Sequence, residues 1–415
     1  MTSRRILLTG LSTYWGGRLA QQIEQWPDVE AIIGVDDKEP TRELERTEYV
    51  RVGSQHALLR RIVQAAQIDT VIDTRLVVDS TTTAGRLAHE NNVIGTMNIL
   101  AGCSGPDSPV RKFVFKSSAH YYGCEQDDPA FFTEKMTRPH PPQTPIEKDI
   151  LEAESAVRDF AQRSPDVSVT LLRFANGIGR GIRTAHLRYF GLPAVPTILG
   201  FDPRYQFIHE DDIVGCLEHV VLNDVPGVFN AAADGVLVLS EVLDLLDKPM
   251  APILPPWGTG VAARVLAGTG VRLPPEMLRQ LRFGRGLDNR KLKAAGYGYR
   301  YTTREAVQEY REAQRVAAVK RGSEQPYRYE REVEEFLRRS PSVRRRASGD
   351  PAHESGGVAG VSSYDELKAD EVAAIVPSLD SGDLEELRRY EAGHRGRTTV
   401  LGAIDRALER SGSGG

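Results

Sequence analysis

The sequence predicts an α/β fold with a doubly wound parallel sheet, followed by a small helical module near the C-terminus. Short apolar runs alternate with amphipathic segments from residue 4 to about residue 174. This alternation requires parallel strands joined by crossover helices. A glycine turn follows the first apolar run, and two acids end the second. A separate group of apolar stripes begins after residue 362.

The first 37 residues carry the most specific pattern. Residues 4–10 (RRILLTG) are expected to form a strand that ends in glycine. Residues 11–26 have helical apolar spacing, and residues 29–37 (VEAIIGVDD) form a second apolar run that ends in acids. Strand, glycine turn, helix, strand and acid together are typical of a dinucleotide-binding βαβ unit.

Each part of this unit has a chemical reason to contact a dinucleotide. Gly10 allows a tight turn, and Gly16 allows the helix to approach the strand, although Thr13 stands where a middle glycine is usual. The helix N-terminus offers N–H groups to a pyrophosphate. Asp36 can accept hydrogen bonds from a ribose 2′-OH and would repel a 2′-phosphate, so NAD is favoured over NADP. The alternatives are a βαβ core without a ligand and a solvated strand end at Asp36 and Asp37.

Length and composition limit the class of protein. A chain of 415 residues is long enough for two or three domains, and its mean hydropathy is −0.35. The net charge of −4 argues against general binding to nucleic acid or to a membrane surface. No apolar run approaches the roughly 18 residues that span a bilayer. The N-terminal residues lead directly into the first strand, so no secretory signal is expected. Cys103, Cys124 and Cys216 lack metal-ligand spacing, which fits reduced thiols in a cytoplasmic protein.

The alternation of strands and helices continues beyond the opening unit. Strands are expected at 48–53, 69–74, 111–118 and 167–174, and helices at 56–67, 89–104 and 146–163. From 175 to 310 glycines and prolines become frequent and the alternation loosens. This region is expected to supply most of a smaller lobe that covers the substrate.

The C-terminal quarter divides into a linker and a module. Residues 320–361 combine a cluster of arginines with Ser, Gly and Pro, which predicts a disordered linker between a domain at 1–319 and a module at 362–411. The arginine cluster either contacts an acidic partner or nucleic acid, or is simply solvated. The module is expected to form three short helices with an apolar interior, near the lower size limit for independent folding. Its inward residues are Leu379, Leu384, Leu387, Val400, Leu401 and Ile404.

Several segments together resemble the NAD-dependent epimerase/dehydratase family of extended short-chain dehydrogenases/reductases. They are ILLTG with Gly16, Asp36, NNVIGTMNIL (91–100), KFVFKSSAHYYG (112–123), VTLLRFANGIGRG (169–181), QFIHEDDI (206–213) and RGLDNRKLKAAGYGYRYTTREAV (285–307). The resemblance covers residues 4 to about 310. It implies a Rossmann-type sheet, NAD as the cofactor and a nucleotide sugar as the substrate. The C-terminal helices resemble a small module found in some actinobacterial proteins, including galactose-epimerase-like ones.

The resemblance also implies a mechanism, from which this sequence departs. In the family, NAD⁺ takes a hydride while a Tyr–Lys pair and a serine handle the hydroxyl proton. Ser118 stands at the position of the family's serine. When Pro145 and Glu154 are aligned, Ile146 and Ile150 fall at the Tyr and Lys positions. The candidate replacement bases are Lys116, His120, Tyr121 and Tyr122.

The resemblance therefore implies three groups of site residues. The catalytic candidates are Ser118 and Tyr122. The candidate cofactor contacts are Gly10, Thr13, Tyr14, Trp15, Gly16, Asp36, Asp37, Thr74 and Lys148. The candidate substrate contacts are Asn176, Arg183 and Arg204. No metal site is expected, because His209 and Asp212 of QFIHEDDI have no third ligand nearby.

Three functions stay open at this point. The first is a nucleotide-sugar epimerase or dehydratase with an unusual base. The second is a non-catalytic or regulatory NAD(P)-binding protein, and the third is a reductase of a non-sugar substrate. The expected partners are a nucleotide sugar or another small molecule, and a protein for the C-terminal helices. A homodimer is also open.

Overall fold

The computed structural model describes residues 4–52, 56–255, 273–323 and 381–412, with isolated positions between 257 and 267 and between 369 and 379. Contacts between residues divide the chain into two compact units, Met1–Lys320 and Arg321–Gly415. The expected linker lies outside the described residues, apart from 320–323. Those four positions belong to helix α12 (Thr303–Ser323).

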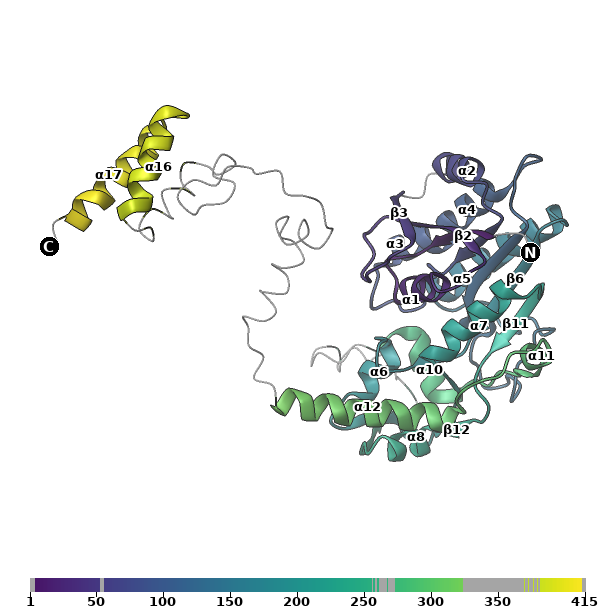
Figure 1. Ribbon diagram of the computed structural model, residues 1–415. Helices are drawn as coiled ribbons and strands as arrows, with labels where there is room; N and C mark the ends of the chain where they lie inside the picture. Colours follow the sequence, from purple (N-terminus) through teal and green to yellow (C-terminus); the bar gives the residue numbers. More distant parts are fainter. Residues whose placement is uncertain are drawn as a thin grey trace. The chain divides into compact units, whose positions relative to one another are not determined.

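The first unit is built on a sheet of seven parallel strands, in the order β11-β6-β5-β4-β1-β2-β3 (Figure 1). Their bounds are β1 (Arg4–Thr9), β2 (Val29–Asp36), β3 (Thr47–Arg51), β4 (Thr70–Asp73), β5 (Lys112–Ser118), β6 (Ser168–Phe174) and β11 (Gly227–Ala231). Six strands lie where the sequence predicts them. The predicted α/β fold with a doubly wound parallel sheet is confirmed, and the edge strand β11 was not expected.

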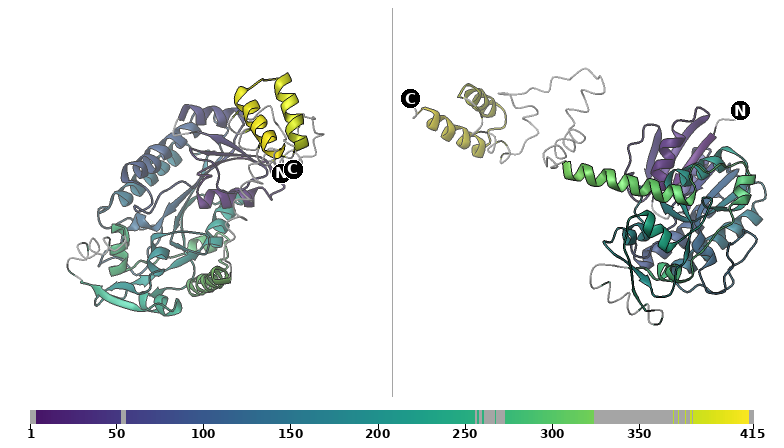
Figure 2. Two further views of the ribbon diagram at one scale, coloured as in Figure 1. Left: turned by 90° about the vertical axis from the view of Figure 1, so that its left-hand side faces the viewer. Right: turned by 90° about the horizontal axis from the view of Figure 1, so that it is seen from below.

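Helices cover both faces of this sheet (Figures 1 and 2). On one face, α2 (His56–Ala65), α4 (Thr96–Cys103) and α5 (Pro145–Arg163) share an apolar cluster with the sheet. On the other face, α1 (Tyr14–Ile23) and α7 (Glu210–Leu222) do so, together with α11 (Arg290–Ala294). The two-residue period of a strand divides β1 accordingly, with Leu7 facing the first cluster and Ile6 and Leu8 the second.

The helix expected at 89–104 has an irregular start. It consists of α3 (Gly85–His89), the π-helical segment η1 (Glu90–Gly95) and α4. Inside η1, the amide of Asn92 accepts a hydrogen bond from the Val77 N–H and donates one to the Val77 carbonyl, both at 2.8 Å. π-Helical turns often occur at functional sites. Here Asn92 fixes the chain that follows β4.

The smaller lobe has its own apolar core. It is formed by α6 (Ala185–Phe190), β8 (Val195–Ile198), α8 (Leu239–Leu245), α10 (Pro275–Phe283) and part of α12. Three two-stranded sheets complete it: β7 (Asn176–Ile178) with β10 (Phe207–His209), β9 (Arg204–Tyr205) with β12 (Leu237–Val238), and β8 with β13 (Met250–Leu254). The lobe takes less of residues 175–310 than predicted, because α7 and β11 pack with the central sheet.

The described part of the second unit contains α16 (Ser381–Gly393) and α17 (Thr398–Gly412). Leu384, Leu387, Val400 and Ile404 are buried between them, Leu379 packs at the edge of this cluster, and Leu401 is half-buried outside it. Most of the helix predicted before residue 377 lies outside the described residues. No helix in the described part of the chain is long and apolar enough to cross a membrane.

Candidate functional site

The glycine turn after β1 requires both of its predicted glycines. Gly10 has a φ of +82°, a conformation that favours glycine. A Cβ on Gly16 would overlap the carbonyl oxygen of Gly10. Thr13, at the middle-glycine position, caps α1. Its hydroxyl donates to the Gly10 carbonyl at 2.6 Å and accepts from the Gly16 N–H at 3.1 Å. A pyrophosphate at this end of α1 would therefore meet the other N–H groups of the first turn.

Asp36 lies at the carboxyl end of β2 and is only 7% exposed. Its Oδ2 accepts a hydrogen bond from the Ser12 N–H at 2.7 Å, and its Oδ1 accepts one from the Asp37 N–H at 2.8 Å. Burial raises the pKa of the Asp36 carboxyl, and the neighbouring Asp37 side chain raises it further. Oδ1 also accepts a longer hydrogen bond from the Lys38 N–H at 3.4 Å, so Oδ2 is the oxygen with room to accept from a ribose hydroxyl. Asp37 is exposed at the rim.

These residues share one hollow, of about 510 Å³. It lies at the carboxyl ends of β1, β2 and β4, where the strand order reverses and ligands bind in folds of this kind. A volume of this size is typical of small-molecule sites. The polar residues that line the hollow include Thr9, Ser12, Thr13, Asp36, Asp37, Lys38, Arg75, Glu90 and Asn91. The glycine turn and the acid at the strand end fit a dinucleotide such as NAD.

Arg75 in this hollow was missed by the sequence prediction. It follows β4, and its guanidinium pairs with Asp73 through Nε and Nη2, both at 3.1 Å. Its side chain crosses close to both Gly10 and Gly95, where a Cβ would crowd it. A planar guanidinium beside the glycine turn suits a phosphate group. The signal in the sequence was an arginine directly after a strand end.

The other predicted cofactor residues lie outside the lining of the hollow. The Thr74 hydroxyl is buried and donates to the Thr9 carbonyl at 2.9 Å. The Tyr14 hydroxyl donates to Glu210 Oε2 at 2.7 Å. The ring of Trp15 packs edge-on against that of Tyr14, with centroids 5.0 Å apart. These three residues lie next to the glycine turn, outside the lining of the hollow.

Lys148 lies on the surface of α5. Its side chain is 65% exposed, and its nearest acid is Glu152, at 3.7 Å. It lines a separate surface depression together with His89 and Asp149. The structure therefore does not bring Lys148 to the dinucleotide hollow. Helix geometry explains this: two residues along a helix turn the side chain by about 200° from Ile146 and Ile150.

The two isoleucines at the Tyr and Lys positions face the interior. Ile146 is 2% exposed and Ile150 is fully buried, and both belong to the apolar cluster under α5. Thr144 caps this helix by accepting a hydrogen bond from the Glu147 N–H at 3.2 Å. Neither isoleucine can transfer a proton.

Ser118 lines a second, small pocket with a volume of about 80 Å³. The pocket adjoins the dinucleotide hollow along the chain, because Val77 lines the hollow and Val78 lines the pocket. Its polar lining residues are Asp79, Ser118, His120, Asn176, Thr184, His186 and Glu276. Of the predicted substrate residues, Asn176 is here. Arg183 and Arg204 are exposed and do not line this pocket.

Several buried polar atoms at this pocket have no hydrogen-bond partner among the described residues. They are Nε2 of His186 and Oε2 of Glu276, together with both amide atoms of Gln280, which lies on the same face of α10 outside the pocket lining. His186 and Gln280 interact with each other but form no well-aligned hydrogen bond. Glu276 Oε1 accepts hydrogen bonds from the backbone N–H and the hydroxyl of Ser80, so Oε2 is the unpaired oxygen of this carboxylate. An unsatisfied buried polar group costs about 1–3 kcal/mol. Such a concentration therefore indicates a place that a polar ligand or ordered water fills.

Tyr122, the second predicted catalytic residue, lies in a different environment. Its hydroxyl donates to Asn230 Oδ1 at 2.8 Å and accepts from Nη1 of Arg173 at 2.8 Å. Arg173 is itself held by Glu154, with Nη2 to Oε2 at 2.6 Å. Burial raises the pKa of Tyr122, and Arg173 partly opposes this. The structure places Tyr122 in a buried network, away from the Ser118 pocket.

His209 and Asp212 connect loops. The Asp212 carboxylate accepts hydrogen bonds from the Tyr297 hydroxyl at 2.9 Å and from the Arg300 N–H at 2.9 Å. His209 Nε2 lies 3.2 Å from Glu309 Oε2. Among the described residues, two groups have ligand atoms close enough for a metal, namely His89 with Asp149 and Glu152, and Asp127 with Asp128 and His140. Neither group borders the Ser118 pocket.

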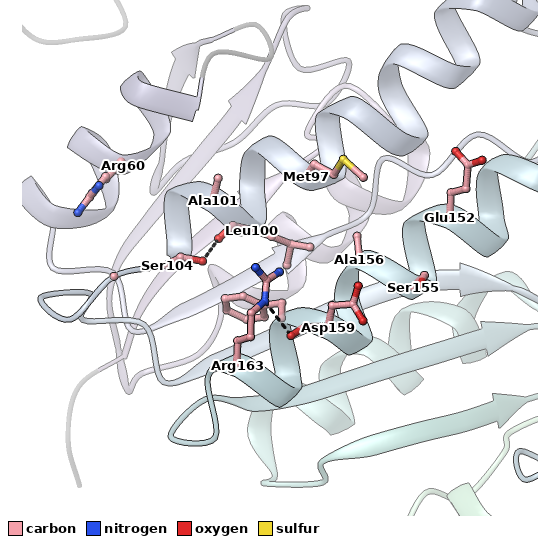
Figure 3. Close-up of a pocket in the computed structure, with 12 residues that line it drawn as sticks. Arg60, Met97, Leu100, Ala101, Ser104, Glu152, Ser155, Ala156, Asp159 and Arg163 are labelled. Carbon is pink, nitrogen blue, oxygen red and sulfur yellow. Dashed lines mark hydrogen bonds between the residues drawn. The ribbon is translucent and has the colours of Figure 1, made fainter.

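A larger surface groove lies between α4 and α5, next to the end of α2 (Figure 3). Met97, Leu100, Ala101 and Ala156 form its apolar floor, and Arg60 and Arg163 stand at its sides. None of the predicted site residues lines it. The groove is therefore separate from the dinucleotide hollow and the Ser118 pocket.

Comparison with known proteins identifies the family. The model of the NAD-dependent epimerase/dehydratase family matches residues 6–232. The chain belongs to the NAD-dependent epimerase/dehydratase family. An uncharacterized protein of Mycobacterium tuberculosis, Rv0501, is 33% identical over 312 residues, which cover 74% of this chain and 82% of that protein. UDP-glucose 4-epimerase 2 of Oryza sativa subsp. japonica is 37% identical over 93 residues, 22% of this chain and 21% of that enzyme.

Solved structures share the fold of this family member. MoeE5 in complex with UDP-glucuronic acid and NAD is 20% identical, with a TM-score of 0.59, and the match covers 75% of this chain and 99% of MoeE5. The dTDP-glucose 4,6-dehydratase DesIV of Streptomyces venezuelae, with NAD bound, is 19% identical with a TM-score of 0.58, and the match covers 78% of this chain and 99% of DesIV.

Proposed function

We propose that the protein binds NAD in the hollow at Asp36 and oxidises an alcohol of a nucleotide sugar at Ser118, as an epimerase or dehydratase with an acid–base group other than Tyr–Lys. The observation that carries this proposal is the set of unpaired buried polar atoms on His186, Glu276 and Gln280. A scaffold without a ligand gains nothing from leaving such atoms unpaired. A hydroxyl-rich ligand would satisfy them.

The chain's own residues fit both parts of the reaction. Asp36 would hold the adenosine ribose, and Arg75 with the first turn of α1 would hold the pyrophosphate. NAD, when bound, supplies a hydride acceptor. Ser118 would hold the reacting hydroxyl, because the Ser118 hydroxyl donates to no described residue. The ligands named for MoeE5, UDP-glucuronic acid and UDP-glucose, support a nucleotide sugar as the substrate class.

A non-catalytic NAD-binding protein is the second candidate. The observation that favours it is the burial of Ile146 and Ile150 at the positions of the acid–base pair. Proton transfer by a positioned group contributes about 10²–10⁴-fold to the rate. A protein that had lost this group without a replacement would keep its cofactor and lose turnover.

One experiment separates these candidates. The purified protein is denatured and the supernatant is assayed for NAD. The intact protein, supplied with NAD⁺, is then mixed with UDP-glucose, UDP-glucuronic acid or dTDP-glucose; the melting temperature is recorded, and the sugar nucleotide is analysed by chromatography for an epimer or a dehydrated product. A raised melting temperature with formation of such a product supports the enzyme. Binding of NAD and a sugar nucleotide without any product supports the non-catalytic protein. Failure to bind NAD contradicts both.

A further inference from the structure

Four ionisable side chains between residues 116 and 122 could replace the missing base, and the structure separates them. Lys116 is buried near the rings of Trp15 and Phe174 and does not line the Ser118 pocket. The ring of Tyr121 packs against the guanidinium of Arg173, whose Cζ lies 3.4 Å from the ring centroid of Tyr121. The hydroxyl of Tyr122 is engaged in a buried network, as described above. His120 is the one candidate of the four that lines the pocket with Ser118.

The backbone holds Ser118 and His120 as a unit. Ser118 ends β5 and caps the short helix η2 (Ala119–Tyr122), because its Oγ accepts a hydrogen bond from the His120 N–H at 3.3 Å. The His120 carbonyl is fixed by the Gly123 N–H at 3.2 Å and by Nη1 of Arg138 at 3.2 Å. The imidazole makes no hydrogen bond to a described residue. Its main chain is therefore rigid, while its ring nitrogens are available to a ligand.

The charges around His120 keep the imidazole neutral. Burial lowers its pKa well below the ordinary value of 6.5, and Arg285, His186 and Arg138 lower it further. Arg285 approaches from the loop after α10, where its Nη1 donates to the Gly123 carbonyl at 2.9 Å. The acids of the pocket are Asp79, which pairs with Arg188 at 2.9 Å, and Glu276, whose own pKa is raised by burial. A neutral imidazole can accept a proton at neutral pH.

We propose that His120 is the catalytic proton acceptor of this protein, taking the hydroxyl proton of a sugar alcohol that Ser118 holds in the same pocket. This inference rests on the proposed function. The alcohol O–H bond breaks and its proton moves to a ring nitrogen of His120. NAD, when bound, would accept the hydride from the carbinol C–H bond, which would leave a ketone. In the reverse direction His120 returns the proton to the oxygen.

The test compares His120→Gln with the wild type, both loaded with NAD⁺. Glutamine keeps a polar group in the pocket but cannot carry a proton. The probes are UDP-glucose, UDP-glucuronic acid and dTDP-glucose, with calorimetry for binding and single-turnover absorbance at 340 nm for NADH. We expect His120→Gln to bind the reacting probe with unchanged affinity and to form NADH about 10²–10⁴-fold more slowly. His140→Gln is the matched control, because His140 pairs with the exposed Asp127 at 2.8 Å, away from the pocket, and should react as the wild type does.

Nuclear magnetic resonance of ¹⁵N-labelled histidine gives a readout without turnover. With NAD bound, the His120 ring should be neutral at pH 7 and should shift when the reacting probe is added. A His120 ring that is protonated at pH 7 overturns the inference. Equal rates of NADH formation by His120→Gln and the wild type also overturn the inference, and they leave the proposed function standing. The variant His186→Gln is measured alongside; a loss of NADH formation in His186→Gln but not in His120→Gln has the same two consequences. A wild type that converts none of the probes to an epimer or a dehydrated product contradicts the proposed function, and the inference falls with it.

Discussion

The carboxylate of Asp36 accepts a hydrogen bond from the backbone N–H of Ser12, with Oδ2 and N 2.7 Å apart. This bond joins the carboxyl end of β2 to the glycine turn that follows β1. The acid that would recognise the ribose and the turn that would hold the pyrophosphate are therefore one rigid unit. A change at Asp36 should affect both.

We expect Asp36→Ala to weaken NAD binding about tenfold or more, because hydrogen bonds to a charged group contribute about 1.5–3 kcal/mol. The same change should reduce the preference for NAD over NADP, since the charge that repels a 2′-phosphate is removed. Calorimetry with both cofactors measures this. Asp37→Ala is the comparison at the exposed rim and should have the smaller effect. Equal affinity of the wild type for NAD and NADP would contradict the assignment of Asp36.

The close approach of α1 to the glycine turn makes a second prediction. Gly16→Ala would place a methyl group against the Gly10 carbonyl oxygen, which is backbone and cannot move aside. Overpacking of this kind typically costs about 1–3 kcal/mol, and we expect a matching fall in the free energy of unfolding. Gly85→Ala in α3 is the control, because a Cβ there meets no atom within 4 Å. It should be neutral or stabilising. An equally stable Gly16→Ala would show that the turn can shift.

The order of the elements could be predicted from the sequence, because apolar periodicity records which face of each strand and helix is buried. β11 escaped this reasoning. Its five residues, 227–231, include a glycine and an asparagine, and they lie in a region rich in turn-forming residues. Only pairing with β6, more than 50 residues earlier, makes this segment a strand. The glycine turn and Asp36 could be predicted because their chemistry is local.

The composition of the Ser118 pocket could not be predicted in the same way. His186 and Glu276 come from α6 and α10, and no local motif joins them to Ser118. Lys148 shows the opposite problem. Its closeness in sequence to the positions of the Tyr–Lys pair suggested a contact with the cofactor, but the period of the helix turns its side chain to the surface. The resemblance to the family singles out Tyr122, which stands at a position that is usually aromatic, but η2 turns its hydroxyl toward Asn230 and Arg173.

Lys148→Ala tests whether this lysine contacts the cofactor. Its side chain is exposed and, among the residues that the structure describes, pairs with Glu152 at 3.7 Å, a surface pair that contributes little to stability. We therefore expect unchanged NAD affinity and an unchanged melting temperature. Asp36→Ala, measured in the same calorimetric series, shows the size of a real cofactor effect. A clear loss of NAD affinity in Lys148→Ala would mean that α5 moves when the cofactor binds.

His186 should make the stability depend on pH. Burial, helped by the charge of Arg285, lowers the pKa of His186 to about 4, whereas the unfolded chain has a histidine pKa of about 6.5. Between these pH values the unfolded state binds more protons than the folded state. The contribution of His186 to the free energy of unfolding is therefore fully present above pH 6.5 and is lost as the pH falls toward 4. At pH 5 this amounts to about 2 kcal/mol. Denaturant unfolding at pH 7.5 and pH 5 should show a smaller difference for His186→Asn than for the wild type. If His186→Asn and the wild type lose the same free energy of unfolding between pH 7.5 and pH 5, a group other than His186 causes the pH dependence.

The last prediction concerns the C-terminal helices. α16 and α17 bury Leu384, Leu387, Val400 and Ile404 against each other, and the contacts of the chain assign them to a unit apart from the sheet. Removal of residues 324–415 should therefore leave NAD affinity unchanged, while gel filtration reports any loss of self-association. Leu387→Asp in the full chain is the milder test, because a charge in this core disrupts the helices without shortening the protein. Both variants should keep the melting transition of the first unit. If either loses NAD binding while circular dichroism shows that the first unit is folded, the C-terminal helices contribute to the cofactor site.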